Sequence, residues 1–286
     1  MMPPVRERRG FSVMGDKSCI LVLGLDELAS AVARRLLLAG YAVAMHAPAP
    51  PAILRRGMAF SDAWYDGAAV LEDVEARRAD SDADFLQALR SALTIPILTQ
   101  RSIEAISRWP WDVVIDARPD PDAATRARIP AEMTIVLGQG GVAGDDCDVV
   151  IEIGGNDPGA VIRSGDAVHA TPSIPETLIG APCTGLFLAV TAIGDLVSAG
   201  QVIGYVGSMP ATAPLFGRLR GLQRSGLHLP RGAPVAALSA DRRAPVDAID
   251  RTHQLIARSV AFVIDREQQG DAIDAWDSTV GFRRFL

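Results

Sequence analysis

The sequence predicts an α/β fold in which a doubly wound parallel sheet domain is followed by a smaller domain of β strands. Two observations favour this prediction. Short apolar segments alternate with segments of helical periodicity from Cys19 to about Ile153, and this alternation is typical of parallel sheets covered by helices. Further along, the phrase that begins at Ala181-Pro182 recurs at Ala213-Pro214, and such a repeat marks duplicated supersecondary units.

The first segment of the α/β part predicts a strand–helix–strand unit. Cys19 to Gly24 is an apolar run, Leu28, Val32 and Leu36 recur at helical spacing, and Tyr41 to Ala47 is a second apolar run. The two strands are expected to be parallel, as in Rossmann-like domains. We expect further elements in this domain, namely helices at Ala52–Trp64 and Ala83–Ala92 and strands at Ile95–Leu98, Trp111–Asp116 and Met133–Leu137.

The composition argues against several classes of protein. The chain has 286 residues, a formal net charge of −6 and a mean hydropathy of +0.19. The acidic balance argues against nucleic acid as a partner, and no apolar run reaches the roughly 18 residues that would indicate a membrane span. Three scattered cysteines predict neither a disulfide framework nor a zinc site. We therefore expect a cytoplasmic protein without a bound metal.

The first candidate site is the turn after the opening strand, at Gly24 and Asp26. A dinucleotide-binding turn uses glycines so that backbone amides can approach a pyrophosphate at a helix N-terminus. Here Gly24 is the one glycine that remains, and Asp26 and Glu27 place negative charge where phosphates would bind. A dinucleotide held in the standard way is therefore disfavoured. Under the alternative interpretation, the two carboxylates complement the positive end of the helix.

The second candidate site is Asp116 with Arg118, which follow the apolar strand residues Val113 to Ile115. The carboxyl edge of a parallel sheet is where open α/β folds bind ligands, so both side chains are expected in that crevice. A local ion pair between them, or a helix cap by Asp116, is the alternative.

The third candidate site is a loop with four glycines directly after the strand Met133–Leu137. Glycines let backbone amides turn inward and hold an anion, and those concerned are Gly138, Gly140, Gly141 and Gly144. Glu152 ends the next apolar run and is expected to face the same crevice. A flexible connection and a solvated carboxylate are the corresponding alternatives.

The repeated segment from Ala181 to Leu238 leads into spaced glycines in each copy. It resembles a barrel-sandwich hybrid domain of the biotinyl/lipoyl type, in which a lysine in a central hairpin carries the cofactor. The corresponding hairpin here is Val206–Ala211, which contains no lysine, and Lys17 is the one lysine of the chain. Covalent biotin or lipoate is therefore not expected.

These features divide the chain into five expected parts. They are a disordered segment at 1–17, the α/β domain at 18–155, a linker rich in Gly, Pro, Ser and Asp at 156–178, the barrel at 179–240 and a C-terminal part at 241–286. In the last part, apolar spacing from Ala248 to Val260 predicts a helix, either alone or followed by a strand at Val260–Ile264.

The order of the motifs resembles the YqeB-type accessory proteins of selenium-dependent molybdenum hydroxylases. The resemblance extends over roughly Cys19 to Ile264 and rests on the segments Gly24–Ser30, Arg55–Gly67, Ile115–Arg118, Leu137–Gly144 and Val149–Ile153. Three departures indicate a diverged member. Pro119 to Asp122 replaces a basic residue of the family, Gly154 to Asn156 replaces its Arg-Gly-His, and Ile256 to Ala261 replaces its glycine-rich segment near the C-terminus.

This resemblance implies a maturation role for a molybdenum-dependent hydroxylase. The chain would bind a nucleotide-like or molybdopterin-type anionic ligand in the α/β crevice, and a molybdoenzyme or its maturation factors would be the partner. Two alternatives from other classes stay open, an NAD(P)-dependent oxidoreductase and a noncatalytic scaffold. A homo-oligomer is compatible with each of the three.

Overall fold

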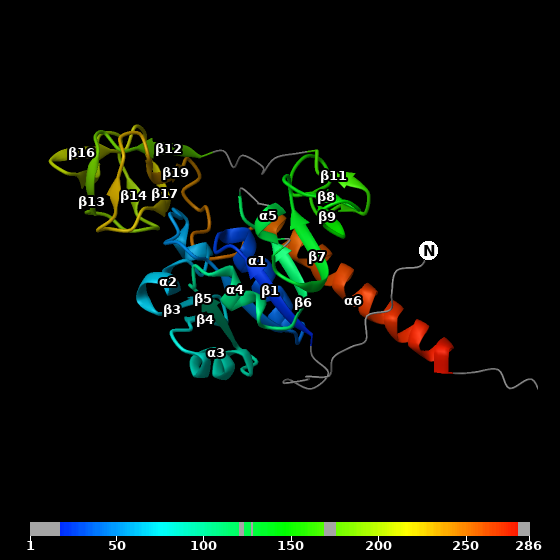
Figure 1. Ribbon diagram of the computed structural model, residues 1–286. Helices are drawn as coiled ribbons and strands as arrows, with labels where there is room; N and C mark the ends of the chain where they lie inside the picture. The colour runs from blue at the N-terminus through cyan, green and yellow to red at the C-terminus, as the bar shows by residue number, and fades with distance from the viewer. Residues whose placement is uncertain (1–17, 120–122, 127, 169–175, 280–286) are drawn as a thin grey trace, which may run out of the picture.

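A nine-stranded sheet organises most of the chain in the computed structural model, which describes residues 18–119, 123–126, 128–168 and 176–279 (Figure 1). The strand order is β10-β9-β7-β6-β1-β2-β5-β4-β3. All neighbours from β9 to β4 are parallel, and the edge strands β10 and β3 are antiparallel. The bounds are β1 Cys19–Leu23, β2 Ala42–His46, β3 Ala68–Leu71, β4 Val74–Arg78, β5 Thr94–Leu98, β6 Trp111–Asp116, β7 Ala131–Leu137, β9 Val149–Ile151 and β10 Val161–Ile162.

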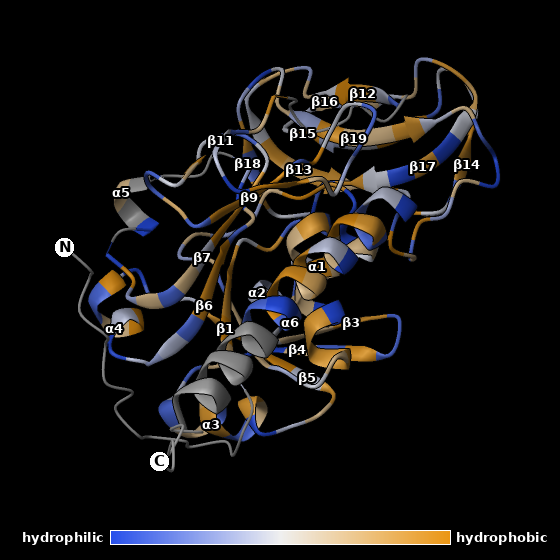
Figure 2. Ribbon diagram, turned by 90° about the vertical axis from the view of Figure 1, so that its right-hand side faces the viewer, coloured by the Kyte–Doolittle hydropathy of each residue, from blue (hydrophilic) through white to orange (hydrophobic). Residues whose placement is uncertain are grey.

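Helices cover both faces of this sheet. All five residues of β1 are buried, as expected for a parallel strand with both faces covered. Ile20 and Val22 pack with α1 and α6, whereas Leu21 and Leu23 pack with α3 and α4. The central strands are accordingly strongly hydrophobic (Figure 2). The bounds are α1 Glu27–Leu38, α2 Asp62–Asp66, α3 Asp82–Leu89, α4 Ile103–Ser107, α5 Ala123–Arg126 and α6 Arg251–Thr279.

Several predicted elements differ from those observed. The helix predicted over Ala52–Trp64 is instead a 3-10 turn, η1 (Arg56–Met58), and the short helix α2. The hairpin of β3 and β4 was not predicted. In the stretch 156–178, predicted as a linker, the structure has β10, β11 (Gly165–Asp166), which pairs with β8 (Val142–Ala143), and the first residues of β12. The predicted disordered segment 1–17 lies outside the described residues.

Two four-stranded antiparallel sheets follow, and together they are called the β unit here. Their orders are β12-β19-β17-β14 and β16-β15-β13-β18, around a core that includes Phe187, Ile203, Leu219 and Val235. The bounds are β12 Thr177–Gly180, β13 Gly185–Ala189, β14 Leu196–Val197, β15 Val202–Val206, β16 Met209–Thr212, β17 Gly217–Leu222, β18 His228–Leu229 and β19 Pro234–Ser239.

The sequence repeat has a structural cause in the β unit. Its equivalent glycines, Gly185 and Gly217, are the first residues of β13 and β17. A Cβ on Gly185 would lie 3.0 Å from the backbone nitrogen of Gly207, and one on Gly217 would lie 2.5 Å from the carbonyl oxygen of Ser239. Both positions therefore require glycine because another backbone segment passes close by.

The last helix returns to the nine-stranded sheet. α6 packs along α1, and Ile249, Ile256, Val260 and Ile264 belong to the same buried cluster as the α1 face of the sheet. The helix runs without a break through Val260–Ile264, so the alternative of a strand there is wrong. Within the described ranges, no helix is long and apolar enough to cross a membrane.

The segment that leads into α2 joins the sheet to the β unit. The amide of Leu222 donates to the carbonyl of Leu54 (2.9 Å), and Nε of Arg56 donates to the carbonyl of Leu222 (3.0 Å). Arg224 pairs with Asp66 (2.7 Å). Backbone and side-chain contacts thus hold β17 against this segment.

Gly57 lies in a tightly packed part of this junction. A Cβ there would lie 2.4 Å from the carbonyl oxygen of Val246, so Gly57→Ala is expected to lower the free energy of unfolding by about 1–3 kcal/mol through overpacking. Urea denaturation of the variant and the wild type checks this, and an unchanged free energy of unfolding in Gly57→Ala would contradict it.

Candidate functional site

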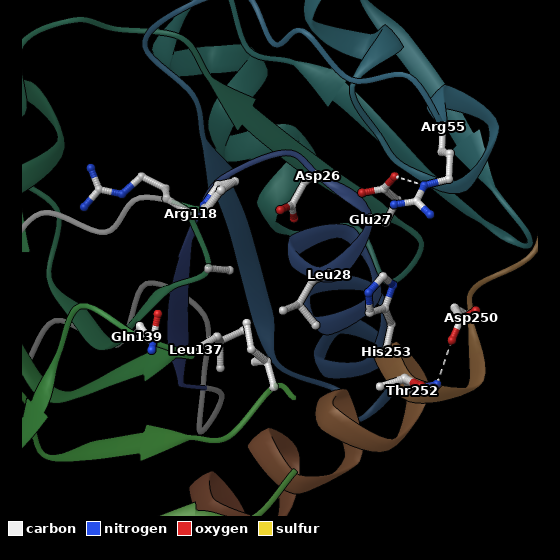
Figure 3. A pocket seen from close by; sticks show the side chains of 13 residues that line it. Asp26, Glu27, Leu28, Arg55, Arg118, Leu137, Gln139, Asp250, Thr252 and His253 are labelled. Carbon is white, nitrogen blue, oxygen red and sulfur yellow. Dashed lines mark hydrogen bonds and ion pairs between the residues drawn. The ribbon is translucent and has the colours of Figure 1, made fainter. Parts of the chain in front are cut away.

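The strand order changes direction between β1 and β6, and a pocket lies at the carboxyl ends of these strands. β1 is followed along the chain by β2 on one side, while β6 lies on the other side; such switch points are the usual binding crevice of open α/β sheets. The pocket has a volume of about 220 Å³ and lies over the first turn of α1 (Figure 3). It is lined by Asp26, Glu27, Leu28, Arg55, Ala117, Arg118, Pro119, Leu137, Gln139, Ile153, Asp250, Thr252 and His253.

Asp26 is the N-cap of α1 and lines this pocket. Its Oδ1 accepts the amide of Ala29 at 2.8 Å. Burial raises the pKa of Asp26 to about 7, an effect that the amide of Ala29 opposes and the nearby charge of Glu27 reinforces. A carboxyl group with this pKa exchanges its proton near neutral pH, and it occupies the helix terminus where a pyrophosphate would bind.

Gly24 shapes the turn before Asp26. Its φ is +119°, a conformation that glycine adopts without steric cost. A Cβ would lie 3.3 Å from the carbonyl oxygen of Ala117, and the Gly24 amide donates to the carbonyl of His46. Gly24 therefore allows the ends of β1, β2 and β6 to lie close together, and it is not among the residues that line the pocket.

Asp116 and Arg118 form a bidentate ion pair at the end of β6. Nε and Nη2 of Arg118 donate to the two carboxylate oxygens at 2.8 and 2.7 Å. Asp116 is fully buried, so it supports the pocket wall from behind, whereas Arg118 is partly exposed and lines the pocket. The local ion pair considered in the sequence analysis is therefore present, and Arg118 is the member that a ligand can reach.

A buried arginine that the sequence analysis missed completes this network. Nη1 of Arg126 donates to Asp116 (3.1 Å), and its Nη2 lies 3.2 Å from the carbonyl oxygen of Gly140 and 3.1 Å from a carboxylate oxygen of Asp146. Its side chain is 1% exposed. Arg126 thereby ties the glycine loop to the end of β6. The sequence carried no signal for this role, because α5 has only four residues.

Two backbone amides of the glycine loop already donate hydrogen bonds within the fold. The amide of Gly138 donates to the carbonyl of Ile151 and that of Gly144 to the carbonyl of Cys147. A Cβ on Gly141 would overlap Val136 at 2.7 Å. Of this loop only Leu137 and Gln139 line the pocket, so the four glycines, Gly138, Gly140, Gly141 and Gly144, shape the loop rather than form the pocket wall.

Glu152 is held by backbone amides away from the pocket lining. Its carboxylate accepts the amides of Ile153 (3.1 Å), Gly154 (3.3 Å) and Val168 (3.0 Å), and the residue is 6% exposed. These contacts fix the turn after β9. The structure therefore brings Asp26, Arg118 and, behind the wall, Asp116 together, but not Glu152.

The far end of the pocket is lined by residues that belong to no motif recognised in the sequence. Arg55 pairs with Glu27 (2.7 Å), and His253 lies at the start of α6. Burial lowers the pKa of His253, against the opposing charges of Glu27 and Asp250, so the imidazole is neutral at pH 7. Its Nδ1 is buried and has no hydrogen-bond partner within the described part of the chain. Only the return of α6 to the sheet places His253 here.

No metal site accompanies this pocket in the portion of the chain that is described. No group of three or more His, Cys, Asp or Glu side chains there is close enough to hold an ion. The pocket is lined by two arginines, a neutral imidazole and three acidic side chains, those of Asp26, Glu27 and Asp250, of which Glu27 is paired with Arg55. These groups can bind an anion and exchange a proton with it.

The fold and site define a protein with a mixed, mostly parallel nine-stranded α/β sheet that carries small antiparallel sheets. The chain is a homologue of YqeB of Escherichia coli strain K12, an uncharacterized protein, with 35% identity over 218 residues. The match covers 73% of this chain and 40% of the relative, so the chain spans about 40% of that relative's length. No family model matches the chain.

Two solved structures show weak similarity. A succinylglutamate desuccinylase/aspartoacylase from Rhodobacter sphaeroides is 16% identical with a TM-score of 0.21. The aligned part covers 48% of the present chain and 60% of the Rhodobacter chain. An aspartoacylase family protein from Mesorhizobium loti is 12% identical with a TM-score of 0.25. The aligned part covers 80% of the present chain and 88% of the Mesorhizobium chain. At these TM-scores neither similarity bears on the fold or the function.

The Arg126 network predicts a large loss of stability. Arg126→Leu would leave buried Asp116 with Arg118 as its remaining arginine and would leave Asp146 with the amide of Val142 but without its arginine, so we expect the free energy of unfolding to fall by about 3–5 kcal/mol. Arg128→Leu is the matched control, because the exposed Arg128–Glu104 pair is worth about 1 kcal/mol or less. Chemical denaturation measures both losses. Similar losses in the two variants would refute a special role for Arg126.

The raised pKa of Asp26 predicts a pH-dependent stability. The folded state binds a proton that the unfolded state has released between about pH 4 and pH 7, so this residue's contribution to stability falls as pH rises through that range. Asp26→Asn keeps a good N-cap and removes the ionisation.

Between pH 5 and pH 8 the wild type should lose stability relative to the variant, by at least about 1 kcal/mol. Denaturant titrations at both pH values measure this, and Asp250→Asn, which alters the cap of α6, is the control. An unchanged difference between pH 5 and pH 8 in Asp26→Asn would rule out the raised pKa.

Proposed function

We propose that this chain binds a small anionic ligand of the nucleotide or pterin type in the crevice between the ends of β1 and β6. The observation that carries the proposal is the placement of Arg118, Arg55 and His253 around one pocket at the switch point of the sheet. A volume of about 220 Å³ lies below the roughly 300–1,000 Å³ of most small-molecule sites. The crevice therefore suits the anionic end of a ligand.

The biological role that we propose is the maturation of a molybdenum-dependent hydroxylase, with that enzyme or its maturation factors as partner. Homology to YqeB supports this only through the family resemblance of the motifs, since the relative itself is uncharacterized. The nine-stranded sheet would be Rossmann-like, and the β unit would be a barrel-sandwich hybrid of the biotinyl/lipoyl type. The turn between β15 and β16 holds Gly207 and Ser208 in place of a cofactor-carrying lysine.

A scaffold role is a second candidate because the β unit has an exposed apolar face. Leu188 on β13 is 50% exposed and pairs across the sheet with Tyr205 on β15, which is 40% exposed. Leu186 and Met209 on the same sheet are also exposed. An NAD(P)-dependent oxidoreductase is disfavoured, because the Asp26 carboxylate already occupies the helix terminus that would receive the pyrophosphate.

Ligand binding at Arg118 distinguishes these functions. Inorganic phosphate should raise the Tm of the wild type, and Arg118→Gln should weaken its binding at least tenfold because a charge-assisted contact is lost. Arg77→Gln is the matched control, since Arg77 is exposed on β4 and pairs with Glu75.

Calorimetric titration with phosphate and NADH measures these affinities, and mass spectrometry of gently denatured protein identifies any ligand that copurifies. NADH is expected to bind no more tightly than phosphate. A wild-type protein that binds neither probe and carries no copurified ligand would favour the scaffold.

A further inference from the structure

A second cavity of about 180 Å³ adjoins the crevice at the junction between the sheet and the β unit. It is formed by the segment before η1, by the start of β12 and by β19. Its lining residues are Glu27, Ala52, Ile53, Leu54, Arg55, Glu176, Leu178 and Ala237. Two of these, Glu27 and Arg55, also line the crevice, so the two cavities meet at this ion pair, which Figure 3 shows at one end of the crevice.

Arg55 lies between two carboxylates at this partition. Its Nε donates to Glu27 at 2.7 Å, while its Nη1 lies 3.5 Å from Oε2 of Glu176. Nη1 is buried and makes no hydrogen bond to any described residue. Glu176 in turn accepts Nη1 of Arg220 at 2.8 Å. Arg55 thus lines both cavities, and an incoming anion would contact the exposed part of its side chain.

The two cavities differ in chemistry. The crevice has polar groups at both ends, whereas the junction cavity presents the apolar side chains of Ala52, Ile53, Leu54, Leu178 and Ala237. The acidic side chains of the junction cavity, Glu27 and Glu176, are engaged by arginines. Leu178 is 60% exposed at its rim. Such a cavity favours a flat apolar or aromatic group over a second charged group.

We propose that the two cavities form one bipartite site, in which Arg55 receives the anionic group of the ligand and the junction cavity receives an attached aromatic ring. This inference rests on the proposed binding of an anion in the crevice and adds the chemical class, an aryl or heteroaryl phosphate or carboxylate. The ring would contact residues of both units, so the bound ligand would bridge the sheet and the β unit.

Methyl phosphate and phenyl phosphate are the probes that test this proposal, because they share an anionic group and differ in the ring. Burial of a ring removes apolar surface from water at about 25 cal/mol per Å², so phenyl phosphate should bind the full-length wild type at least tenfold more tightly. Arg55→Gln should weaken both probes alike. Isothermal titration calorimetry measures the four affinities.

Two variants test the placement of the ring. Ala52→Trp fills the junction cavity from an exposed position, and Leu178→Ala removes its rim; each should reduce the preference for phenyl phosphate to less than threefold while methyl phosphate binds as before. The matched controls are Ala83→Trp, at an exposed position on α3, and Leu188→Ala, at an exposed position on β13. Both controls should keep the tenfold preference.

The outcomes separate this inference from the proposed function. If methyl phosphate binds and phenyl phosphate binds no more tightly, or if the preference survives Ala52→Trp, the bipartite site is wrong while the anion site remains. If neither probe binds the wild type, both proposals fail together.

Discussion

The fully buried carboxylate of Asp116, held between two arginines, is the interaction on which the site depends. A buried charge without partners costs several kcal/mol, so β6 can end inside the protein only because Arg118 and Arg126 both reach Asp116. Arg118 forms a wall of the crevice, and Arg126 holds the loop after β7 through Gly140 and Asp146. One ion cluster thereby fixes the ends of two neighbouring strands and the shape of the pocket between them.

The segment from Ala52 to Asp66 has a comparable role between the sheet and the β unit. Its Arg55 lines both cavities. The carbonyl of Leu54 and the side chain of Arg56 form hydrogen bonds with the backbone of Leu222 in β17. Leu54, Arg56 and Gly57 each lie against residues that are distant in sequence, so substitutions at these three positions would disturb the junction.

Local pattern was sufficient for much of the fold and for part of the site. The strand Trp111–Asp116 and the helix near Ala83 were predicted because apolar periodicity is a local property, and Asp26 and Arg118 were found because parallel strands share a carboxyl edge. Arg55, Arg126 and His253 were not found, since each is positioned by packing across the chain. The glycine loop and Glu152 were assigned to ligand binding from the sequence. The sequence does not reveal that the amides of Gly138 and Gly144 already donate to the carbonyls of Ile151 and Cys147, or that Glu152 already accepts the amide of Val168.

The return of α6 to the sheet has a consequence for how the protein is made. The buried cluster on the α1 face includes Ile249, Ile256, Val260 and Ile264, which are synthesised after the whole β unit. Until they leave the ribosome, α1 and the central strands lack an apolar cover, whereas the β unit already holds all of its own strands. The β unit is therefore free to fold while α6 is still being synthesised, and the larger sheet is exposed to aggregation until α6 packs onto it.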